Sequence, residues 1–178
     1  MKIVNGLLDS ARQHVSPNFD TRPDLNIDLV VVHGISLPPG EFGGDWIDNF
    51  FSNTLDANAH PYFNDIADMR VSSHLLIRRD GEVVQYVNFN QRAWHAGQSS
   101  FEGRDCCNDY SIGIELEGTD DIPYEEAQYQ QLAEVIGCLR QHYPVITEQR
   151  VTGHSDIAPG RKTDPGEAFD WSHLHKLL

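Results

Sequence analysis

The sequence predicts an α/β protein of the mixed α+β type, in which a central mixed β-sheet is flanked by helices. Three observations support this prediction: a wholly apolar, β-branched run at 29–32, a hairpin signal at Asp80-Gly81, and one long amphipathic helix pattern between strand patterns. Strands that precede, surround and follow such a helix favour a sheet covered by helices. No repeat or linker-like segment interrupts the chain, so we expect a single domain over residues 1–178.

The N-terminal third begins with an irregular lead-in and then contains one clear strand pattern. Residues 29–32 have the unbroken apolar character of a strand buried on both faces, and His33 comes directly at its end. The Gly- and Pro-rich stretch 34–44 is expected to form a long loop of the kind that lines a site. Apolar residues at helical spacing then predict a short helix over residues 45–53.

The remaining elements are read from the same periodicities. Strands are expected at 71–77 and 83–87, where they form the hairpin, and again at 146–153. A long helix is expected between Pro123 and Pro144, because its apolar residues repeat at spacings of three and four. A short helix over 170–178 completes the chain.

The segment 111–117 alternates strictly, which is typical of a strand with two different faces. Its isoleucines and leucine share one face, and Gly113, Glu115 and Glu117 share the other. Carboxylates on such a face usually meet water. Gly113, however, lets another group approach closely, which makes Glu115 the leading candidate for a general base, with Glu117 as the alternative.

Composition limits the classes of partner. The chain carries 13 Lys and Arg against 27 Asp and Glu, a formal net charge of −14, which disfavours nucleic acid and anionic membrane surfaces. The N-terminus lacks an apolar run of signal-peptide length, and no segment approaches the length of a membrane-spanning helix. We therefore expect a cytoplasmic monomer that acts on a small soluble molecule.

The Gly- and Pro-rich loop 151–166 gathers an imidazole, an ammonium and a carboxylate: His154, Lys162 and Asp164. Catalytic zinc uses three protein ligands of nitrogen, oxygen or sulfur type and keeps one position open. His33 with His154 and Asp164 would supply a His₂Asp set. Each histidine also has a plain structural interpretation, and Lys162 is equally compatible with an ordinary surface lysine, so the residues alone leave this site open.

Two further histidines lie in informative surroundings. His74 stands among apolar residues and is expected to pack or to make a core hydrogen bond. The Trp94-His95 pair in a loop offers an apolar platform with a polar tip for a ligand, although a packed loop aromatic beside an exposed histidine explains it equally well.

Five segments together closely resemble the AmpD family of zinc-dependent 1,6-anhydro-N-acetylmuramyl-L-alanine amidases, which act in cell-wall recycling. They are VVHGISLPPGEFGG (31–44), RVSSHLLIRRDGEVVQYV (70–87), RAWHAG (92–97), CNDYSIGIELEGTD (107–120) and TGHSDIAPGRKTDPG (152–166). The similarity extends from about residue 15 to 171 with nearly uniform spacing. It implies an amidase-2 fold, like that of the peptidoglycan-recognition proteins.

The resemblance also implies a role for each matching residue. The zinc ligands would be His33, His154 and Asp164, with Glu115 as general base and Lys162 stabilising an oxyanion. The implied reaction is hydrolysis of the amide between anhydromuramic acid and L-alanine in soluble muropeptides. The residues in the regions that bind the muropeptide would be Arg70, Trp94, His95 and Gly34.

Two positions depart from the family pattern. Gly34 replaces a common asparagine, and Cys106 replaces a common arginine. Both departures are expected to affect the preference for the peptide more than the reaction itself. The alternatives are an amidase acting on polymeric peptidoglycan, a non-catalytic muropeptide-binding module that has lost a ligand, and a regulatory muropeptide sensor. The presence of all three ligand types argues against the non-catalytic module, and no partner-binding stretch is evident for a sensor.

Overall fold

The computed structural model describes residues 1–178 and is built on a six-stranded sheet in the order β12-β5-β11-β6-β7-β3. In that order the strands are β12 (Val151–Gly153), β5 (Leu29–Ile35), β11 (Ser111–Glu117), β6 (Leu75–Ile77), β7 (Val83–Gln85) and β3 (Arg12–Gln13). The first four run parallel, and β6 and β7 form the antiparallel pair. The predicted mixed sheet with flanking helices is confirmed.

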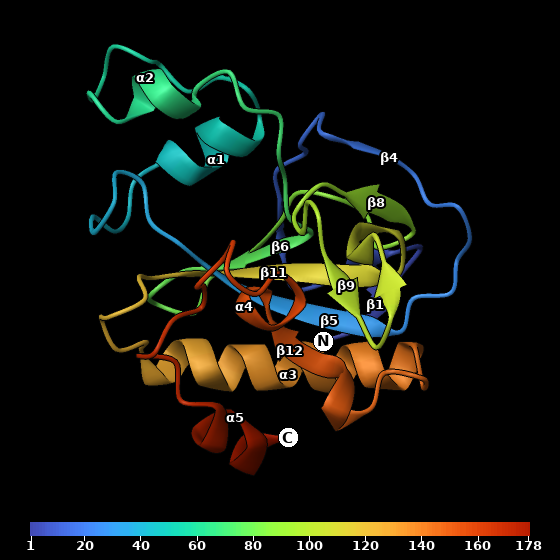
Figure 1. Ribbon diagram of the computed structural model, residues 1–178. Coiled ribbons are helices and arrows are strands. Elements are labelled where there is room, and N and C mark those ends of the chain that lie inside the picture. The colour runs from blue at the N-terminus through green and yellow to red at the C-terminus, as the bar shows by residue number, and fades with distance from the viewer.

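One face of the sheet packs on the long helix α3 (Glu126–His142), which Figure 1 shows running beneath the strands, with α5 (Trp171–Leu177) below it. The main apolar cluster fills this layer. Ile112, Ile114 and Leu116 of β11 meet α3 residues such as Leu132 and Ile136, and all five are fully buried. The alternation seen in the sequence therefore places the apolar face of β11 against α3.

Gln128 fastens the start of α3 to the sheet. Its Oε1 accepts from the N–H of Glu125 at 3.0 Å, and its Nε2 donates to the carbonyls of Ile77 and Glu117 at 3.2 and 3.0 Å. These two carbonyls end β6 and β11. The helix therefore begins at Glu126, three residues after the predicted start at Pro123.

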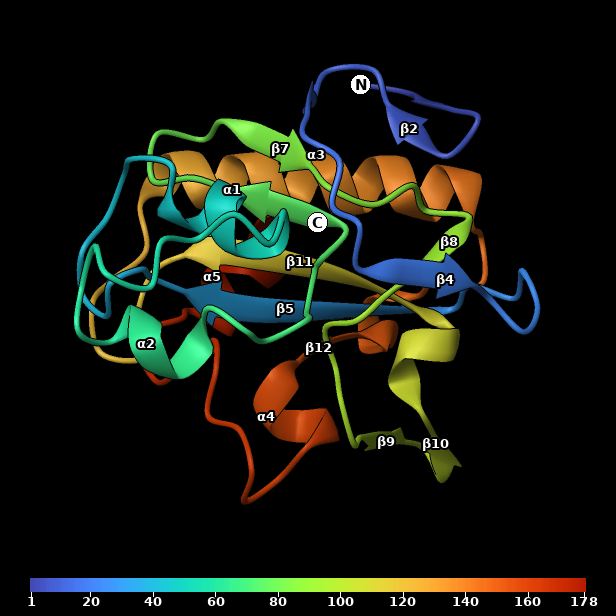
Figure 2. The same cartoon turned by 90° about the horizontal axis from the view of Figure 1, so that it is seen from above.

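The opposite face of the sheet is covered by short elements (Figures 1 and 2). Helices α1 (Trp46–Phe51) and α2 (Phe63–Ile66) pack over β6 and β7, while α4 (His154–Ile157) follows β12 directly. Two small strand pairs surround them: β4 (Phe19–Thr21) with β8 (Gln91–Ala93), and β9 (Ser100–Phe101) with β10 (Arg104–Asp105). A third pair, β1 (Ile3–Val4) with β2 (Leu7–Leu8), packs on the α3 side instead. Single 3-10 turns lie at η1 (Cys107–Asp109) and η2 (Glu148–Arg150). None of the helices combines the length and apolar character needed to cross a membrane.

Four predicted strands have different limits in the structure. β7 ends at Gln85, whereas the prediction ran to residue 87. β5 continues through His33 to Ile35, because its pairing with β11 extends over Gly34 to the pair Glu117 and Ile35. β6 begins only at Leu75, since the N–H groups of Ser72 and His74 bond to the carbonyls of Trp94 and Gly113 instead of joining a regular ladder. The last strand is reduced to β12, which η2 precedes.

Candidate active site

The register of three parallel strands brings the candidate residues together. Glu115 of β11 is the direct partner of His33 in β5, so both side chains point to the face opposite α3. On the other side of β5, Gly153 pairs with Val32, which places His154 level with His33. The predicted meeting of His33 with the 151–166 loop therefore occurs at the carboxyl ends of these strands.

The three predicted ligands converge on one point. Nδ1 of His33 lies 2.9 Å from Nδ1 of His154 and 3.1 Å from Oδ2 of Asp164, and the remaining pair is separated by 3.0 Å. Ligand atoms of a tetrahedral zinc ion, each about 2.0–2.1 Å from the metal, are roughly 3.3 Å apart. His33, His154 and Asp164 thus form a cluster of a size that can hold a metal ion.

The hydrogen bonding of His154 tests whether a cation fits there. Its Nε2 lies 3.1 Å from the carbonyl oxygen of Ala96, which can only accept, so Nε2 carries the ring proton. Nδ1 of a neutral ring is then a bare lone pair that faces an Asp164 oxygen and another imidazole nitrogen. Acceptors that face one another at 3 Å require a positive charge between them, a proton in the metal-free protein or a metal ion, so these residues fit a metal ion.

The ionisation of the cluster suits a divalent cation. Burial lowers the pKa of His33 to about 4, so its ring is neutral at pH 7. Burial alone would raise the pKa of Asp164, but the imidazoles of His154 and His33 outweigh it and hold that pKa well below its usual range. A neutral His33 and an ionised Asp164 are in the protonation state that metal binding needs.

Glu115 and Glu117 share a face of β11 but have different surroundings. Glu117 accepts from the N–H groups of Gly43 and Arg79 at 2.6 and 3.2 Å, and it lies 3.8 Å from the guanidinium of Arg78. Glu117 thus fastens the glycine-rich loop to the sheet. Glu115 instead lines the cleft above the histidines.

The environment of Glu115 favours the protonated acid. Its burial, aided by the nearby Asp164 and opposed by Lys162, raises its pKa well above the ordinary value. A carboxyl group with a raised pKa is a stronger base when it is ionised, which is the property a general base requires. Of the two carboxylates the sequence left open, Glu115 is the one that lines the cleft with the histidines.

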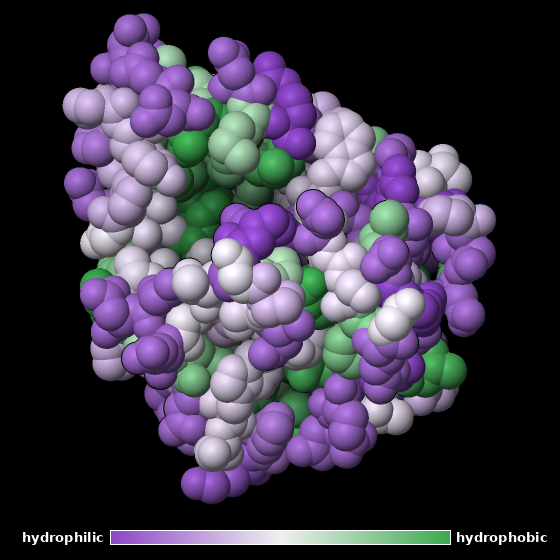
Figure 3. Space-filling view, viewed as in Figure 1, coloured by the Kyte–Doolittle hydropathy of each residue, from purple (hydrophilic) through white to green (hydrophobic).

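A cleft of about 520 Å³ lies over the cluster. His33, Glu115, Asp164 and Lys162 are among its polar lining residues. Its apolar wall is formed by Leu37, Phe50, Phe51, Ile66, Met69 and Val71. Figure 3 shows this wall as a green hollow beneath α1 and α2, next to hydrophilic surface. A ligand here would meet apolar surface on one side and the polar cluster on the other.

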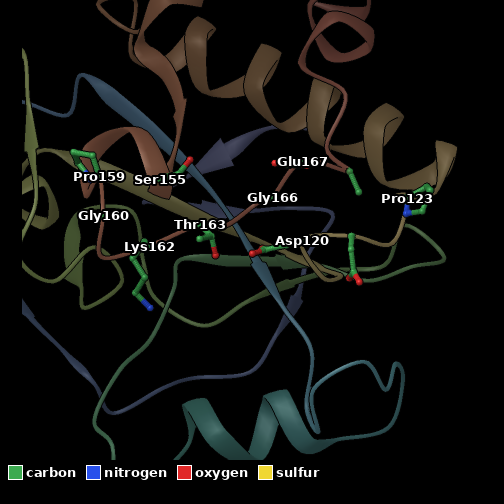
Figure 4. A pocket seen from close by; sticks show the side chains of 11 residues that line it. Asp120, Pro123, Ser155, Pro159, Gly160, Lys162, Thr163, Gly166 and Glu167 are labelled. Carbon is green, nitrogen blue, oxygen red and sulfur yellow. The ribbon is translucent and has the colours of Figure 1, made fainter.

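A second, polar pocket of about 1010 Å³ adjoins the cleft (Figure 4). Asp120 and Lys162 line both, so the two spaces meet at these residues. Ser155, Thr163 and Glu167 line the second pocket as well. The site therefore has room for a ligand with an apolar part and a polar part.

The residues predicted to bind substrate are placed unequally. Gly34, Trp94 and His95 line the cleft. Arg70 is exposed, does not line it, and donates to the carbonyls of Ala67 and Met69 at 3.3 and 3.2 Å. A Cβ on Gly34 would lie 2.5 Å from the hydroxyl oxygen of Tyr124, so a larger residue there requires Tyr124 to move.

The predicted core role of His74 is confirmed, since its Nδ1 accepts from the N–H of Gly113 at 3.0 Å. Sequence reasoning missed the groups that surround the ligands: the carbonyl of Ala96, the hydroxyl of Ser111, and Tyr124, which donates to the carbonyl of Pro165 at 2.9 Å. A carbonyl has no sequence signal. Ser111 and Tyr124 become visible only once β5 and β11 are paired.

Solved structures with this architecture define the class of protein as a peptidoglycan amidase. A crystal structure of a selenomethionine derivative of AmpD has a TM-score of 0.97 at 60% identity and covers 100% of this chain and 99% of that chain. The amidase AmiD of Escherichia coli, solved with the substrate anhydro-N-acetylmuramic acid-L-Ala-D-gamma-Glu-L-Lys, has a TM-score of 0.62 at 31% identity and covers 85% of this chain and 57% of that chain.

A family model described as N-acetylmuramoyl-L-alanine amidase, Amidase_2, matches residues 23–167, and the chain belongs to this family. The 1,6-anhydro-N-acetylmuramyl-L-alanine amidases AmpD of Citrobacter freundii and Escherichia coli K12 are 60% and 59% identical over 179 residues. These alignments cover 100% of this chain and 95% and 97% of the two relatives. The resemblance to the AmpD family is thus confirmed.

Proposed function

We propose that the protein is a zinc-dependent amidase that hydrolyses the bond between 1,6-anhydro-N-acetylmuramic acid and L-alanine in soluble muropeptides. One observation carries the proposal: His33, His154 and Asp164 converge with their acceptor atoms facing one another, and Glu115 stands beside them as the register partner of His33. Full-length similarity to AmpD enzymes supports the substrate class.

The three acceptors would hold the ion, and Zn²⁺ bound there would polarise the scissile carbonyl and the attacking water. The oxygen of the water bonds to the carbonyl carbon, and Glu115, as carboxylate, accepts a proton from that water. The C–N bond then breaks, and Glu115 returns that proton to the leaving amine of L-alanine. The products are a carboxylic acid on the sugar and a free peptide amine.

Lys162 is proposed to stabilise the negative charge that develops on the carbonyl oxygen. It is exposed and reaches the edge of the cleft from the loop after α4 (Figure 4), so its ammonium is available to a bound ligand. The neighbouring polar pocket would accept one part of the muropeptide and the apolar wall another. We also propose that the enzyme works as a monomer in the cytoplasm on soluble muropeptides.

The test compares two substrates with the same zinc-loaded protein. Soluble anhydromuropeptide should release L-alanyl peptide, intact sacculi should release far less, and exhaustive chelation should abolish both reactions until zinc is restored. Activity that survives complete zinc removal would overturn the metal mechanism. A preference for sacculi would identify an amidase of polymeric peptidoglycan instead, and binding without turnover would identify a non-catalytic module or a sensor.

A further inference from the structure

The hydroxyl of Ser111 starts a hydrogen-bond chain with a defined direction. Its oxygen lies 2.6 Å from the carbonyl oxygen of Cys107 and 3.1 Å from Nε2 of His95. The carbonyl can only accept, so the Ser111 hydroxyl donates its single proton to this carbonyl. The Ser111 oxygen must then accept from His95, which places the proton of a neutral His95 on Nε2.

The same logic passes from His95 to His33. With its proton on Nε2, His95 presents a bare Nδ1, and this atom lies 2.9 Å from Nε2 of His33. Nε2 of His33 is therefore the donor, and its Nδ1 is a bare lone pair. That lone pair lies on the side where His154 and Asp164 converge.

We propose that Ser111 and His95 are positioning residues, which fix the ring proton of His33 on Nε2 and so keep its Nδ1 lone pair available to the metal ion. This inference rests on the proposed function, because it assumes that the cluster binds zinc. Groups of this kind orient the ligands of a metal and raise their basicity.

The position of His33 explains why side chains perform this task. The proton of His154 is fixed by a main-chain carbonyl, that of Ala96. His33 instead lies inside β5, whose main chain is paired with β11 on one side and β12 on the other. Main-chain carbonyls of the sheet are engaged in these ladders, so an acceptor has to come from a side chain above the sheet.

The structure holds His95 firmly in this position. Its ring lies over Gly113, where a Cβ would be 2.4 Å from Cγ of His95, so only glycine leaves room for the ring. The N–H groups of His95 and Ala96 both donate to Oδ1 of Asn108, at 3.1 and 2.8 Å. The close approach that Gly113 was expected to allow is therefore that of His95.

The first experiment reads the ring protons directly. Zinc-loaded protein with ¹⁵N-labelled histidine should show, in long-range ¹H–¹⁵N spectra, protons on Nε2 of both His33 and His95. A proton on Nδ1 of His95 would overturn the proposal. This measurement needs only the unmodified protein, so it decides the question even where a variant fails to fold.

The second experiment measures zinc affinity by competition with a chelator. Ser111→Ala and His95→Phe should bind zinc about 10–100-fold more weakly, the usual cost of removing such a group. His95→Asn, whose amide oxygen can stand near the former Nδ1, should recover part of the loss. Ser73→Ala is the matched control, because Ser73 is also fully buried but its hydroxyl has no hydrogen-bond partner.

The outcomes separate this inference from the proposed function. Zinc affinity in Ser111→Ala and His95→Phe equal to that in Ser73→Ala would overturn the positioning role while leaving the metal site intact. Zinc affinity unchanged in His33→Ala would instead overturn the metal site itself.

Discussion

The two faces of the central sheet are built from the same strands but have opposite chemistry. On the α3 face, β11 presents Ile112, Ile114 and Leu116 to a fully buried apolar layer. On the other face the same strand presents Glu115 to a cleft lined by histidines, and its Gly113 lies beneath the ring of His95. A shift of one residue in the register of β11 would exchange these two sets.

The difference between the two faces shows that packing of the sheet against α3 determines which residues meet on the opposite, reactive face. The apolar residues of β11 and β5 have one satisfactory register against α3, and this register makes Glu115 the partner of His33. The site therefore inherits its geometry from the core. Ile114 and Glu115, neighbours in sequence on opposite faces, allow the two roles to be separated by mutation.

The largest expected effect is on the reactive face. Glu115→Gln should lower kcat by about 10²–10⁴-fold, because a positioned general base is typically worth that much. Zinc affinity should stay within a few-fold of the original, and stability should not fall, since a buried amide avoids the cost of a buried charge. Turnover of anhydromuropeptide and chelator competition measure the two quantities. A near-normal kcat would assign the proton transfer to another group.

A substitution on the packed face should instead lower stability and leave kcat nearly unchanged. Ile114 is fully buried against α3, so Ile114→Ala should lower the free energy of unfolding by about 2–5 kcal/mol. The kcat of the folded fraction should change only a few-fold. Denaturant unfolding of the metal-free protein measures the first quantity. A large loss of kcat at unchanged stability would show that the faces are not separable in this way.

Most of the fold could be predicted from the sequence because periodicity reports burial directly. The segment 111–117 alternates, the segment 29–32 is continuously apolar, and both are strands in the structure. Most errors fall at element ends, although the lead-in that was expected to be irregular contains the short strand β4. β5 runs on through Gly34, and β6 starts late, because tertiary pairing rather than local composition decides where a strand stops.

The candidate site was predictable in its residue types but not in its contacts. His154 and Asp164 share one loop, whereas the meeting with His33 depends on a pairing across more than a hundred residues. The residues alone left that meeting open, and the family resemblance implied it. Nothing in the sequence distinguishes the exposed Arg70 from a residue that lines the cleft. Likewise, no local pattern marks Ser111 as a partner of His95, since their contact exists only after β11 is paired and the loop is folded over it.

The smallest effect concerns the pH dependence of stability in the metal-free protein. Burial lowers the pKa of His33 to about 4 and holds the pKa values of His74 and His95 well below the ordinary value of about 6.5. The unfolded chain therefore binds more protons than the folded one in mild acid. The free energy of unfolding should therefore decrease as the pH falls below about 6.5. Each histidine contributes at most about 1.4 kcal/mol per pH unit to this decrease.

Glu115 changes the stability with pH in the opposite direction to the histidines, which allows a more specific test. Because its pKa is raised, the folded protein takes up a proton there that the unfolded chain does not, which offsets part of the loss in mild acid. Denaturant unfolding between pH 7.5 and 5 should thus show a steeper decline in Glu115→Gln than in the original protein. His142→Gln, which removes an exposed histidine, should leave the slope unchanged. A flat profile in all three proteins would mean that the histidines over the sheet are not held neutral by burial, and the two faces would then differ less in their electrostatics than the structure indicates.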